Sequence, residues 1–287
     1  MKRIIYSFYI DIPKDELDIF DKNILKPGQA PVNYHTKNAF RKNYQKLISC
    51  KEWYASECNV EFKLFEYDSD FIFYKDKLKG NYPYLTTYNI VNFYKIHLLY
   101  KLAQEYDEVL YLDFDVIPML NENFFEVWDL SKGIAIKDNN SQVIMMDDVT
   151  EKSQTIRSPT AKYYNGQALL IDSGHRPKHK VVNTGIIGAS KKHLDQLAYF
   201  DNFAADLQRM SDVREYHDMY PEKIRNFFGW DNETLWGVKQ VENNVPVQWL
   251  NDKWHYHFHN QMFIPKEVVM CHTINKDFDT VWRRYYA

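Results

Sequence analysis

The sequence has few cysteines, no long apolar run and almost no excess of charge of either sign. Its three cysteines, Cys50, Cys58 and Cys271, are too few and too irregularly spaced for a disulfide framework or a zinc site, so we expect a reducing, cytoplasmic location. No stretch approaches the roughly 20 apolar residues of a membrane span. The 36 basic and 39 acidic residues are spread along the chain, which argues against a nucleic-acid partner.

The N-terminal residues and the composition indicate a globular protein without a signal peptide. Residues 1–12 begin with basic side chains, but their apolar run is short and meets Asp11. With 287 residues, of which 45% are hydrophobic and 16% aromatic, the chain has enough apolar material for a substantial core. The sequence shows no internal repeat and no low-complexity linker, so we expect a single domain over residues 1–287.

Short apolar segments alternate with stretches of helical spacing, which is typical of an α/β protein. The expected strands cover residues 3–10, 60–65, 108–112, 133–137, 181–187 and 268–271, and the expected helices cover 88–106, 190–210 and 231–242. Ser190 and Asp231 are the expected N-caps of the last two helices. The polar segment 138–180 contains Gly and Pro, and we expect it to be a long mobile loop near a site.

The segment Glu108–Pro118 ends an apolar strand with two carboxylates, Asp113 and Asp115. In α/β sheets, ligands bind beyond the carboxyl ends of the strands. Two carboxylates at i and i+2 repel each other unless a cation lies between them, and oxygen ligands favour Mg²⁺ or Mn²⁺ with phosphate oxygens as further ligands. The alternative is a solvated strand end with a capping Asp.

Several segments, in order along the chain, carry a resemblance to a known enzyme family. They are residues 3–10, Asn92–Lys95, Val109–Val116, Val182–Ile186 and Trp230–Leu235, with a weaker match over Val269–Lys276. The combination of Tyr-Leu-Asp-Phe-Asp with a downstream Asn-Thr-Gly resembles the metal-dependent, GT-A-fold glycosyltransferases of family 8, which are glycogenin-like or bacterial galactosyltransferase-like. The resemblance implies a Rossmann-like mixed sheet flanked by helices, in which residues 1–120 bind the nucleotide and residues 121–287 contain the acceptor-binding part and the C-terminal segment.

The resemblance also implies a metal site. Asp113 and Asp115 look like the pair that holds Mn²⁺, or Mg²⁺, against the diphosphate of a nucleotide sugar, and His272 resembles the third ligand, unless it is a satisfied core histidine. Lys95 stands where the family has an arginine that approaches the donor, although Lys lacks the bidentate fork. Lys276 as a diphosphate clamp is a hypothesis, because the Pro-Trp that usually follows the family lysine is absent.

A second group of residues is implied to lie beside the transferred sugar. Asn183 and Gly185 resemble the Asn-x-Gly turn of the family, and Gly would let the backbone come close to the ligand; a plain turn is the alternative. Asp231 resembles the carboxylate that holds sugar hydroxyls, whereas Asn232 replaces the usual Gln and Glu233 a common Asp. Asp231 could instead only cap its helix.

The nucleotide is expected at the first strand. Phe8, Tyr9 and Ile10 stand where the fold contacts the nucleobase, and an aromatic ring there could stack on uracil; Asp11 could reach the base or ribose. Phe114, between the two aspartates, is included in the same site. Phe8 and Tyr9 could equally be ordinary strand residues with one side chain in the core.

Two further segments are open to more than one interpretation. His255, His257 and His259 would share a strand face, where they could contact an acceptor glycan or bind a metal. Residues 281–287 mix aromatic and basic side chains, which some bacterial relatives use to touch membrane surfaces, although packing against the domain is the expected outcome.

The resemblance predicts an enzyme that moves a hexose from a nucleotide sugar, with uridine expected, to a glycan or other hydroxyl acceptor, with retention of configuration. In an inverting enzyme, Asp231 or Glu233 would act as the general base. A phosphatase of the haloacid dehalogenase type and an inactive carbohydrate-binding module are the remaining alternatives. The donor sugar, the acceptor and the oligomeric state are not encoded in these motifs.

Overall fold

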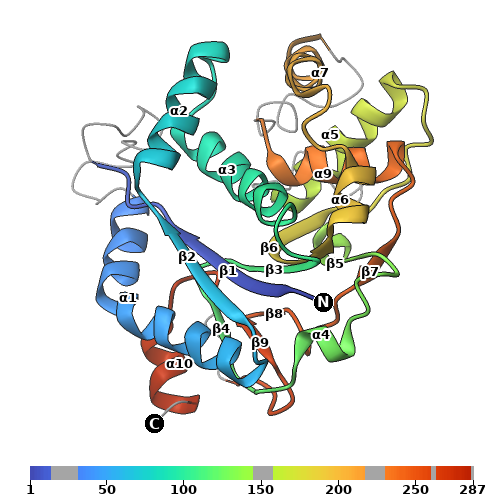
Figure 1. The fold of residues 1–287 in the computed structure, drawn as a ribbon. Coiled ribbons are helices and arrows are strands. Elements are labelled where there is room, and N and C mark those ends of the chain that lie inside the picture. Colours follow the sequence, from blue (N-terminus) through green and yellow to red (C-terminus); the bar gives the residue numbers. More distant parts are fainter. Residues whose placement is uncertain (14–31, 145–157, 217–229, 260–262, 286–287) are drawn as a thin grey trace.

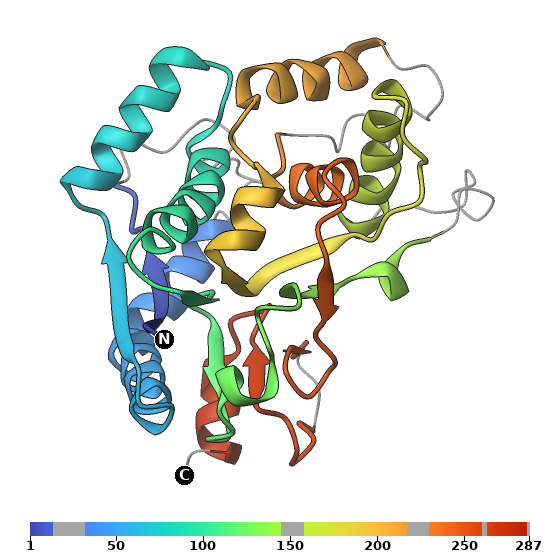
Figure 2. The same cartoon turned by 45° about the vertical axis from the view of Figure 1, so that its right-hand side comes forward.

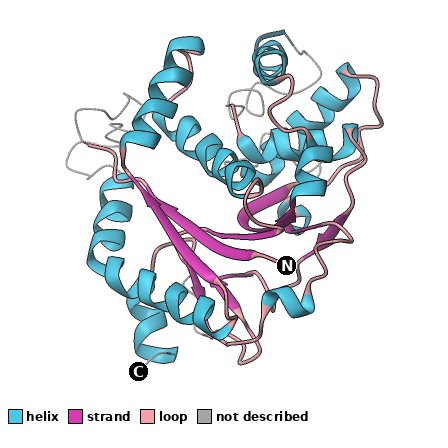
Figure 3. Cartoon of the chain, viewed as in Figure 1, coloured by secondary structure: helices cyan, strands magenta, loops and turns pink. Residues whose placement is uncertain are grey.

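The computed structural model describes residues 1–13, 32–144, 158–216, 230–259 and 263–285. A mixed sheet crosses the middle of the molecule and has helices on both faces (Figures 1 and 3). Its strands lie in the order β2 (Glu61–Glu66), β1 (Arg3–Tyr9), β3 (Glu108–Leu112), β6 (Val182–Ser190), β5 (Ile134–Asp138) and β7 (Val247–Trp249). The strand β1 runs parallel to β2 and β3, whereas β6 runs antiparallel to β3 and β5.

A smaller sheet lies directly below the end of β3 in the view of Figure 2. It consists of β4 (Val116–Pro118), β9 (Met270–His272) and β8 (Tyr256–His257). The strand β4 follows β3 after three residues and pairs antiparallel with β9, so that Val116 faces His272 in the register. This pairing brings the C-terminal part of the chain to the two aspartates between β3 and β4.

The helices divide between the two faces of the main sheet (Figures 1 and 2). One face is covered by α2 (Ser69–Asn81), α3 (Thr87–Leu102), α5 (Ser158–Asp172), α6 (Lys191–Leu197), α7 (Phe203–Tyr216) and α9 (Asn232–Glu242). The other side has α1 (Val32–Glu57), α4 (Phe124–Val127) and α10 (Phe278–Tyr285), and a short 3-10 turn, η3 (Asn140–Gln142), follows β5.

Alternation along the strands builds both cores. In β3, Val109 and Tyr111 pack with the helices of the first face, whereas Leu110 and Leu112 pack on the other side with residues of α1 and α4. All four side chains are fully buried. Because successive side chains of a strand point to opposite faces, a buried strand with apolar residues at every position holds the two layers together.

The strands and helices that the sequence predicted are present apart from corrections in two regions, but the prediction did not include α1, α2, α4, α10, β4, β7 and β8. The stretch 138–180 is not a single long loop, because η3 and α5 lie within it; residues 145–157 lie outside the described part. Ala161, Tyr164, Ala168 and Leu169 are buried along one side of α5 at helical spacing. The sequence analysis predicted a loop because polar residues lie on either side of this short apolar stripe.

The predicted helix 190–210 is two helices. The first, α6, begins after Ser190, whose side chain makes no capping bond, and it ends at Ala198 in the left-handed conformation with φ 49°. A second helix, α7, begins at Phe203. The break lets the Tyr199 hydroxyl donate to the backbone oxygen of Asn232, 3.0 Å away, so tertiary contacts override the continuous helical spacing.

The beginning of the C-terminal segment packs against the molecule, as expected, while residues 286–287 lie outside the described part. Val281 and Trp282 are buried in α10, and the indole nitrogen of Trp282 donates to Asn43 Oδ1 at 2.7 Å. Among the described helices, none has the length and apolar character that a membrane crossing requires. All three cysteines are buried free thiols.

Candidate active site

Asp113, Asp115 and His272 converge between the two sheets. His272 Nε2 lies 3.3 Å from Asp115 Oδ2 and 3.8 Å from Asp113 Oδ2. One ligand atom from each residue lies within 4.8 Å of the others. Two carboxylates and one imidazole form a mixed oxygen and nitrogen donor set, which fits Mn²⁺ better than Mg²⁺. These three residues could therefore hold a divalent metal.

The aspartates are held by cations of the protein. Lys276 Nζ lies 2.5 Å from Asp115 Oδ2, and Lys95 Nζ lies 3.7 Å from Asp113 Oδ1. Burial alone would raise the pKa of Asp115, but the charge of Lys276, with hydrogen bonds from His272 and Lys276, outweighs it and holds this pKa well below its ordinary value. Asp115 is therefore an anion inside the protein, which is the state that binds a metal.

The turn between the aspartates is fixed from below by α1. Lys51, which is fully buried, donates from Nζ to the backbone oxygen of Phe114 at 2.9 Å. The Tyr111 hydroxyl donates to Asp113 Oδ1 from the preceding strand. The sequence analysis missed both residues, because neither a lysine in a helix nor a tyrosine in a strand forms a motif.

Gly185 is needed beside His272. The backbone amide of Asp113 donates to its carbonyl oxygen at 2.7 Å, and its own amide donates to Asn183 Oδ1 at 2.9 Å. A Cβ atom on Gly185 would lie 2.5 Å from His272 Cε1 and 2.7 Å from Nδ1. The predicted Asn-x-Gly turn is wrong, because Asn183 and Gly185 lie within strand β6. Gly185 leaves room for the predicted metal ligand, which is a more direct reason for glycine than an approach to the sugar.

A chain of polar contacts leads from the aspartates to helix α9. Lys95 Nζ also lies 3.5 Å from the backbone oxygen of Thr184, whose amide donates to Glu233 Oε1 at 2.8 Å. Lys162 pairs with Glu233 Oε2 and lies 3.4 Å from Asp231 Oδ1. Burial would raise the pKa of Glu233, but Lys162 and Lys95 lower it to about 2.

Asp231 divides its two oxygens between different partners. Oδ2 caps α9 by accepting from the amide of Thr234 at 2.7 Å and from its hydroxyl at 2.9 Å, as expected of an N-cap. Oδ1 faces Lys162. The neighbouring Asn232 is 4% exposed and donates to Thr184 Oγ1 at 3.1 Å, so its amide joins α9 to β6.

A polar pocket of about 290 Å³ opens beside Asp231 and is lined by α3, α5 and the start of α9. Asn165 on α5 contributes to its lining and is only 1% exposed. Neither atom of its side-chain amide has a hydrogen-bond partner among the described residues. Sequence reasoning missed Asn165 and Lys162 because both lie on the helix that was expected to be a loop.

The residues expected to contact the nucleotide do not form one open surface. Phe8 and Phe114 are 9% and 4% exposed, and Phe8 packs against Tyr111 in the core, as the alternative for this strand proposed. Tyr9 stacks on Phe114 with ring centroids 4.8 Å apart. Ile10 is partly buried against the same core as Phe8.

Asp11 lies farther out and is held by cations of α1. Arg41 lies 2.7 Å from its Oδ2, and Lys37 lies 3.7 Å from its Oδ1. Its Oδ1 accepts no hydrogen bond from the described residues. Its role toward the nucleotide stays a prediction.

His255 and His257 lie against His272 instead of forming a face with His259. His255 Nε2 is 2.9 Å from His272 Nδ1, and the two rings stack with centroids 5.1 Å apart. His255 is fully buried, so it cannot touch an acceptor glycan. Burial, with a smaller contribution from neighbouring histidines, lowers the pKa of His255 well below its ordinary value and that of His257 to about 3.

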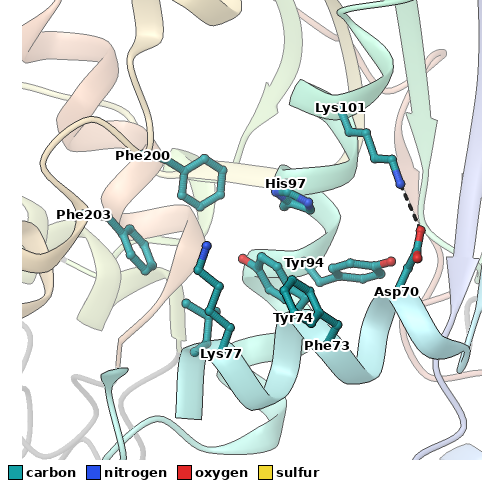
Figure 4. A pocket seen from close by; sticks show the side chains of 10 residues that line it. Asp70, Phe73, Tyr74, Lys77, Tyr94, His97, Lys101, Phe200 and Phe203 are labelled. Carbon is teal, nitrogen blue, oxygen red and sulfur yellow. Dashed lines mark hydrogen bonds and ion pairs between the residues drawn. The ribbon is translucent and has the colours of Figure 1, made fainter. Parts of the chain in front are cut away.

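A second pocket, of about 330 Å³, lies between α2, α3 and the connection from α6 to α7 (Figure 4). Tyr74 stacks on His97 with centroids 4.7 Å apart, and Lys101 pairs with Asp70 at 3.0 Å. None of the predicted site residues lines this pocket. The chemistry-bearing side chains of the described part gather around His272 and Asp231 instead.

Comparison with protein families identifies the enzyme family to which this chain belongs. The family model of glycosyl transferase family 8 matches residues 9–202, well over half of the chain. The chain belongs to glycosyl transferase family 8. This membership confirms the prediction of a glycosyltransferase and, with the mixed α/β sheet, that of a GT-A fold. The phosphatase alternative does not agree with it.

Solved structures of glycosyltransferases resemble the chain only distantly. A glycosyltransferase involved in the glycosylation of the major capsid of PBCV-1 is 13% identical, with 98% of each chain covered and a TM-score of 0.41. The galactosyltransferase LgtC, solved with donor and acceptor sugar analogues, is also 13% identical; the match covers 95% of this chain and 87% of that chain, with a TM-score of 0.41. Mouse xyloside xylosyltransferase 1 is 12% identical over 75% of this chain and 76% of that one, with a TM-score of 0.37. No curated protein matches in sequence.

Proposed function

We propose that this family 8 enzyme transfers a hexose from a UDP-sugar to a hydroxyl group of a glycan or other acceptor, with Mn²⁺ or Mg²⁺ as cofactor. The observation that carries the proposal is the convergence of Asp113, Asp115 and His272, with one ligand atom from each within 4.8 Å of the others. When bound there, the metal would act as a Lewis acid that stabilises the negative charge developing on the leaving diphosphate.

Two ammonium groups stand where that charge would develop. Lys276 and Lys95 each contact one of the aspartates, so both lie at the rim of the proposed metal site. A divalent cation would replace them as partners of the carboxylates and free them to bind phosphate oxygens. Fixed cations that meet developing charge in a site that excludes water are among the strongest contributions to catalysis.

The transferred sugar would lie in the pocket beside Asp231. This pocket is polar and its lining includes Asn165, Asn232 and Asp231, groups that donate to and accept from hydroxyls. The unpartnered amide of Asn165 is suited to a sugar hydroxyl, because a buried polar group without a partner costs free energy until a ligand satisfies it. Asn183 Oδ1 accepts from the amide of Gly185 within β6, and its role toward the sugar is part of the same proposal.

Retention of configuration is favoured by the state of the carboxylates. An inverting enzyme needs a base that accepts the proton of the acceptor hydroxyl, and such a base works best with a pKa near the working pH. Glu233 has a pKa of about 2, and Asp231 is shared between a helix cap and Lys162. Neither is suited to that role, whereas a retaining reaction needs no strong base.

Thermal shift with UDP, GDP, TDP, CMP and their common sugar conjugates, each with and without Mn²⁺, tests the proposal, since a ligand that binds only the folded state raises its stability. We expect uridine compounds alone to shift the melting temperature, and only with Mn²⁺. A shift that is equal with and without metal would contradict the metal role. NMR of the product anomer then decides between retention and inversion.

Three finer expectations belong to the same proposal. Residues 1–120 would bind the nucleotide and residues 121–287 would contain the acceptor-binding part. Phe8, Tyr9, Ile10 and Asp11 would approach the nucleobase after local rearrangement. The enzyme would work in the cytoplasm, in keeping with its free thiols.

A further inference from the structure

The imidazole of His272 has a different environment at each of its two nitrogens. Nε2 faces the carboxylates, at 3.3 Å from Asp115 and 3.8 Å from Asp113. Nδ1 faces His255 Nε2 at 2.9 Å, and the ring of His257 lies beside both, with its centroid 5.6 Å from that of His272 and 4.8 Å from that of His255. One ring therefore borders two groups of metal-ligating atoms.

The three histidines form a compact nitrogen cluster. One ring nitrogen from each lies within 4.8 Å of the others. His257 Nε2 and His255 Nδ1 are buried and have no hydrogen-bond partner among the described residues. His255 is fully buried and His257 partly so. Lys137, the nearby cation, is already paired with Asp252.

The chemistry of this cluster differs from that of the carboxylate site. Imidazole nitrogens suit Zn²⁺, Cu²⁺, Ni²⁺ and Co²⁺, whereas carboxylate oxygens suit Mg²⁺ and Mn²⁺. A set of three histidines with no carboxylate is a known way of holding zinc. We propose that His255, His257 and His272 form a second metal site, selective for Zn²⁺ and similar ions, on the side of His272 opposite the aspartates.

The two sites compete because they share His272. A neutral imidazole has one nitrogen with a lone pair and one that carries hydrogen. Binding at the carboxylate site uses the lone pair of Nε2, with the hydrogen on Nδ1 directed to His255. Binding at the three-histidine site uses Nδ1 and moves the hydrogen to Nε2, where Asp115 accepts it, so no proton is gained or lost. This competition rests on the proposed function; the three-histidine site does not.

Metal binding by the intact protein tests the proposal without an activity assay. Calorimetry with Zn²⁺ and the absorption spectrum of bound Co²⁺ report the nitrogen site, and the electron paramagnetic resonance of free Mn²⁺ reports the carboxylate site. In His257→Ala we expect Zn²⁺ affinity to fall at least about tenfold, as loss of even an outer partner of a metal site does, while Mn²⁺ binding is kept. Asp113→Asn should do the reverse, because it removes a carboxylate from the Mn²⁺ site and leaves Asp115 to accept the hydrogen of His272.

His259→Ala is the matched control, because His259 is an exposed histidine two residues away and outside the cluster. It should leave Zn²⁺ affinity unchanged. Equal losses in His257→Ala and His259→Ala, or no loss in either, would overturn the proposal. Zn²⁺ should also displace bound Mn²⁺ from the unsubstituted protein and much less from His257→Ala. Failure of all Mn²⁺ binding with intact Zn²⁺ binding would refute the proposed function and leave the three-histidine site standing.

Discussion

The carboxylate site of Asp113 and Asp115 and the pocket beside Asp231, which we call the proposed sugar pocket, both contain acidic residues but hold them differently. Asp113 and Asp115 are paired with Lys95 and Lys276 at the rim of a cluster that also contains an imidazole. At the start of α9, a single lysine, Lys162, contacts both Asp231 and Glu233. At the carboxylate site, a metal could replace the lysines as the partner of the aspartates. At the start of α9, Asp231 caps the helix, and the neutral amide of Asn165 is left to bind a ligand.

The largest difference between the regions should appear in Asp115→Asn. Removing the charge takes away a metal ligand, and since a metal supplies several kcal/mol of transition-state stabilisation, sugar transfer should fall on the order of a thousandfold. The Mn²⁺-dependent shift of melting temperature by nucleotide should disappear with it. Asp279→Asn, at an exposed ion pair with Lys42, is the control and should change neither quantity.

Gly185→Ala tests whether glycine is required in β6 to make room for His272. The added Cβ would lie 2.5 Å from His272 Cε1 and would displace the ring. We expect Mn²⁺ affinity to fall about 10- to 100-fold and the protein to lose about 1–3 kcal/mol of stability. In Gly80→Ala, where nothing lies within 4 Å of the new Cβ, stability should stay level or rise. Unchanged metal affinity in Gly185→Ala would show that another residue is the third ligand.

The stability of the protein should depend on pH through Glu233, at the start of α9. The pKa of Glu233 is lowered from 4.5 to about 2 in the folded protein. Its contribution to stability is therefore complete above pH 4.5 and is lost as the pH falls toward 2. Glu233→Gln should lower the unfolding free energy by about 1–2 kcal/mol at neutral pH, and this deficit should shrink as the pH falls through that window. The exposed Glu267→Gln should follow the unsubstituted protein throughout.

The smallest effect is expected from Asn165→Leu, with opposite signs for stability and function. Removing an unpartnered buried amide should leave stability level or raise it by about 1 kcal/mol, while loss of one hydrogen bond to the sugar should lower kcat/KM about tenfold. The added stabilisation that the sugar of the donor provides over bare nucleotide should shrink as well.

Asn43→Leu provides the contrast. That amide is also buried, but Nδ2 donates to the backbone oxygen of Ala39 and Oδ1 accepts from Trp282. Its replacement should destabilise the protein. The extra stabilisation that a nucleotide sugar provides over the bare nucleotide should stay unchanged. A loss of stability in Asn165→Leu would mean that the amide already has a hydrogen-bond partner in the free protein, which would contradict its proposed role in binding the sugar.

The residues of the proposed metal site could be picked out from the sequence because they lie in short motifs at strand ends. Asp113 and Asp115 follow a buried strand, and His272 ends another apolar segment. What brings them together, the antiparallel pairing of β4 with β9, involves strands of three residues each, too short to give a periodic pattern. The family resemblance, and not local pattern, placed His272 beside the aspartates.

The residues of the proposed sugar pocket were much harder to predict from the sequence. Lys162 and Asn165 lie on α5, which is flanked by polar residues and contains Gly166, so composition favoured a loop. Asn165 is functional in our account because it lacks a partner, and the absence of a partner can be seen only in three dimensions. The same holds for His255, whose neighbour across the small sheet is 17 residues away in sequence.

The measurement that tests the central claim most directly is the binding of Mn²⁺ followed by electron paramagnetic resonance, with and without UDP, in the unsubstituted protein and in Asp115→Asn. If Asp113, Asp115 and His272 hold the metal against the diphosphate of the donor, UDP should tighten Mn²⁺ binding, and the substitution should abolish it. Mn²⁺ binding that UDP does not change, or that survives Asp115→Asn, would contradict the account.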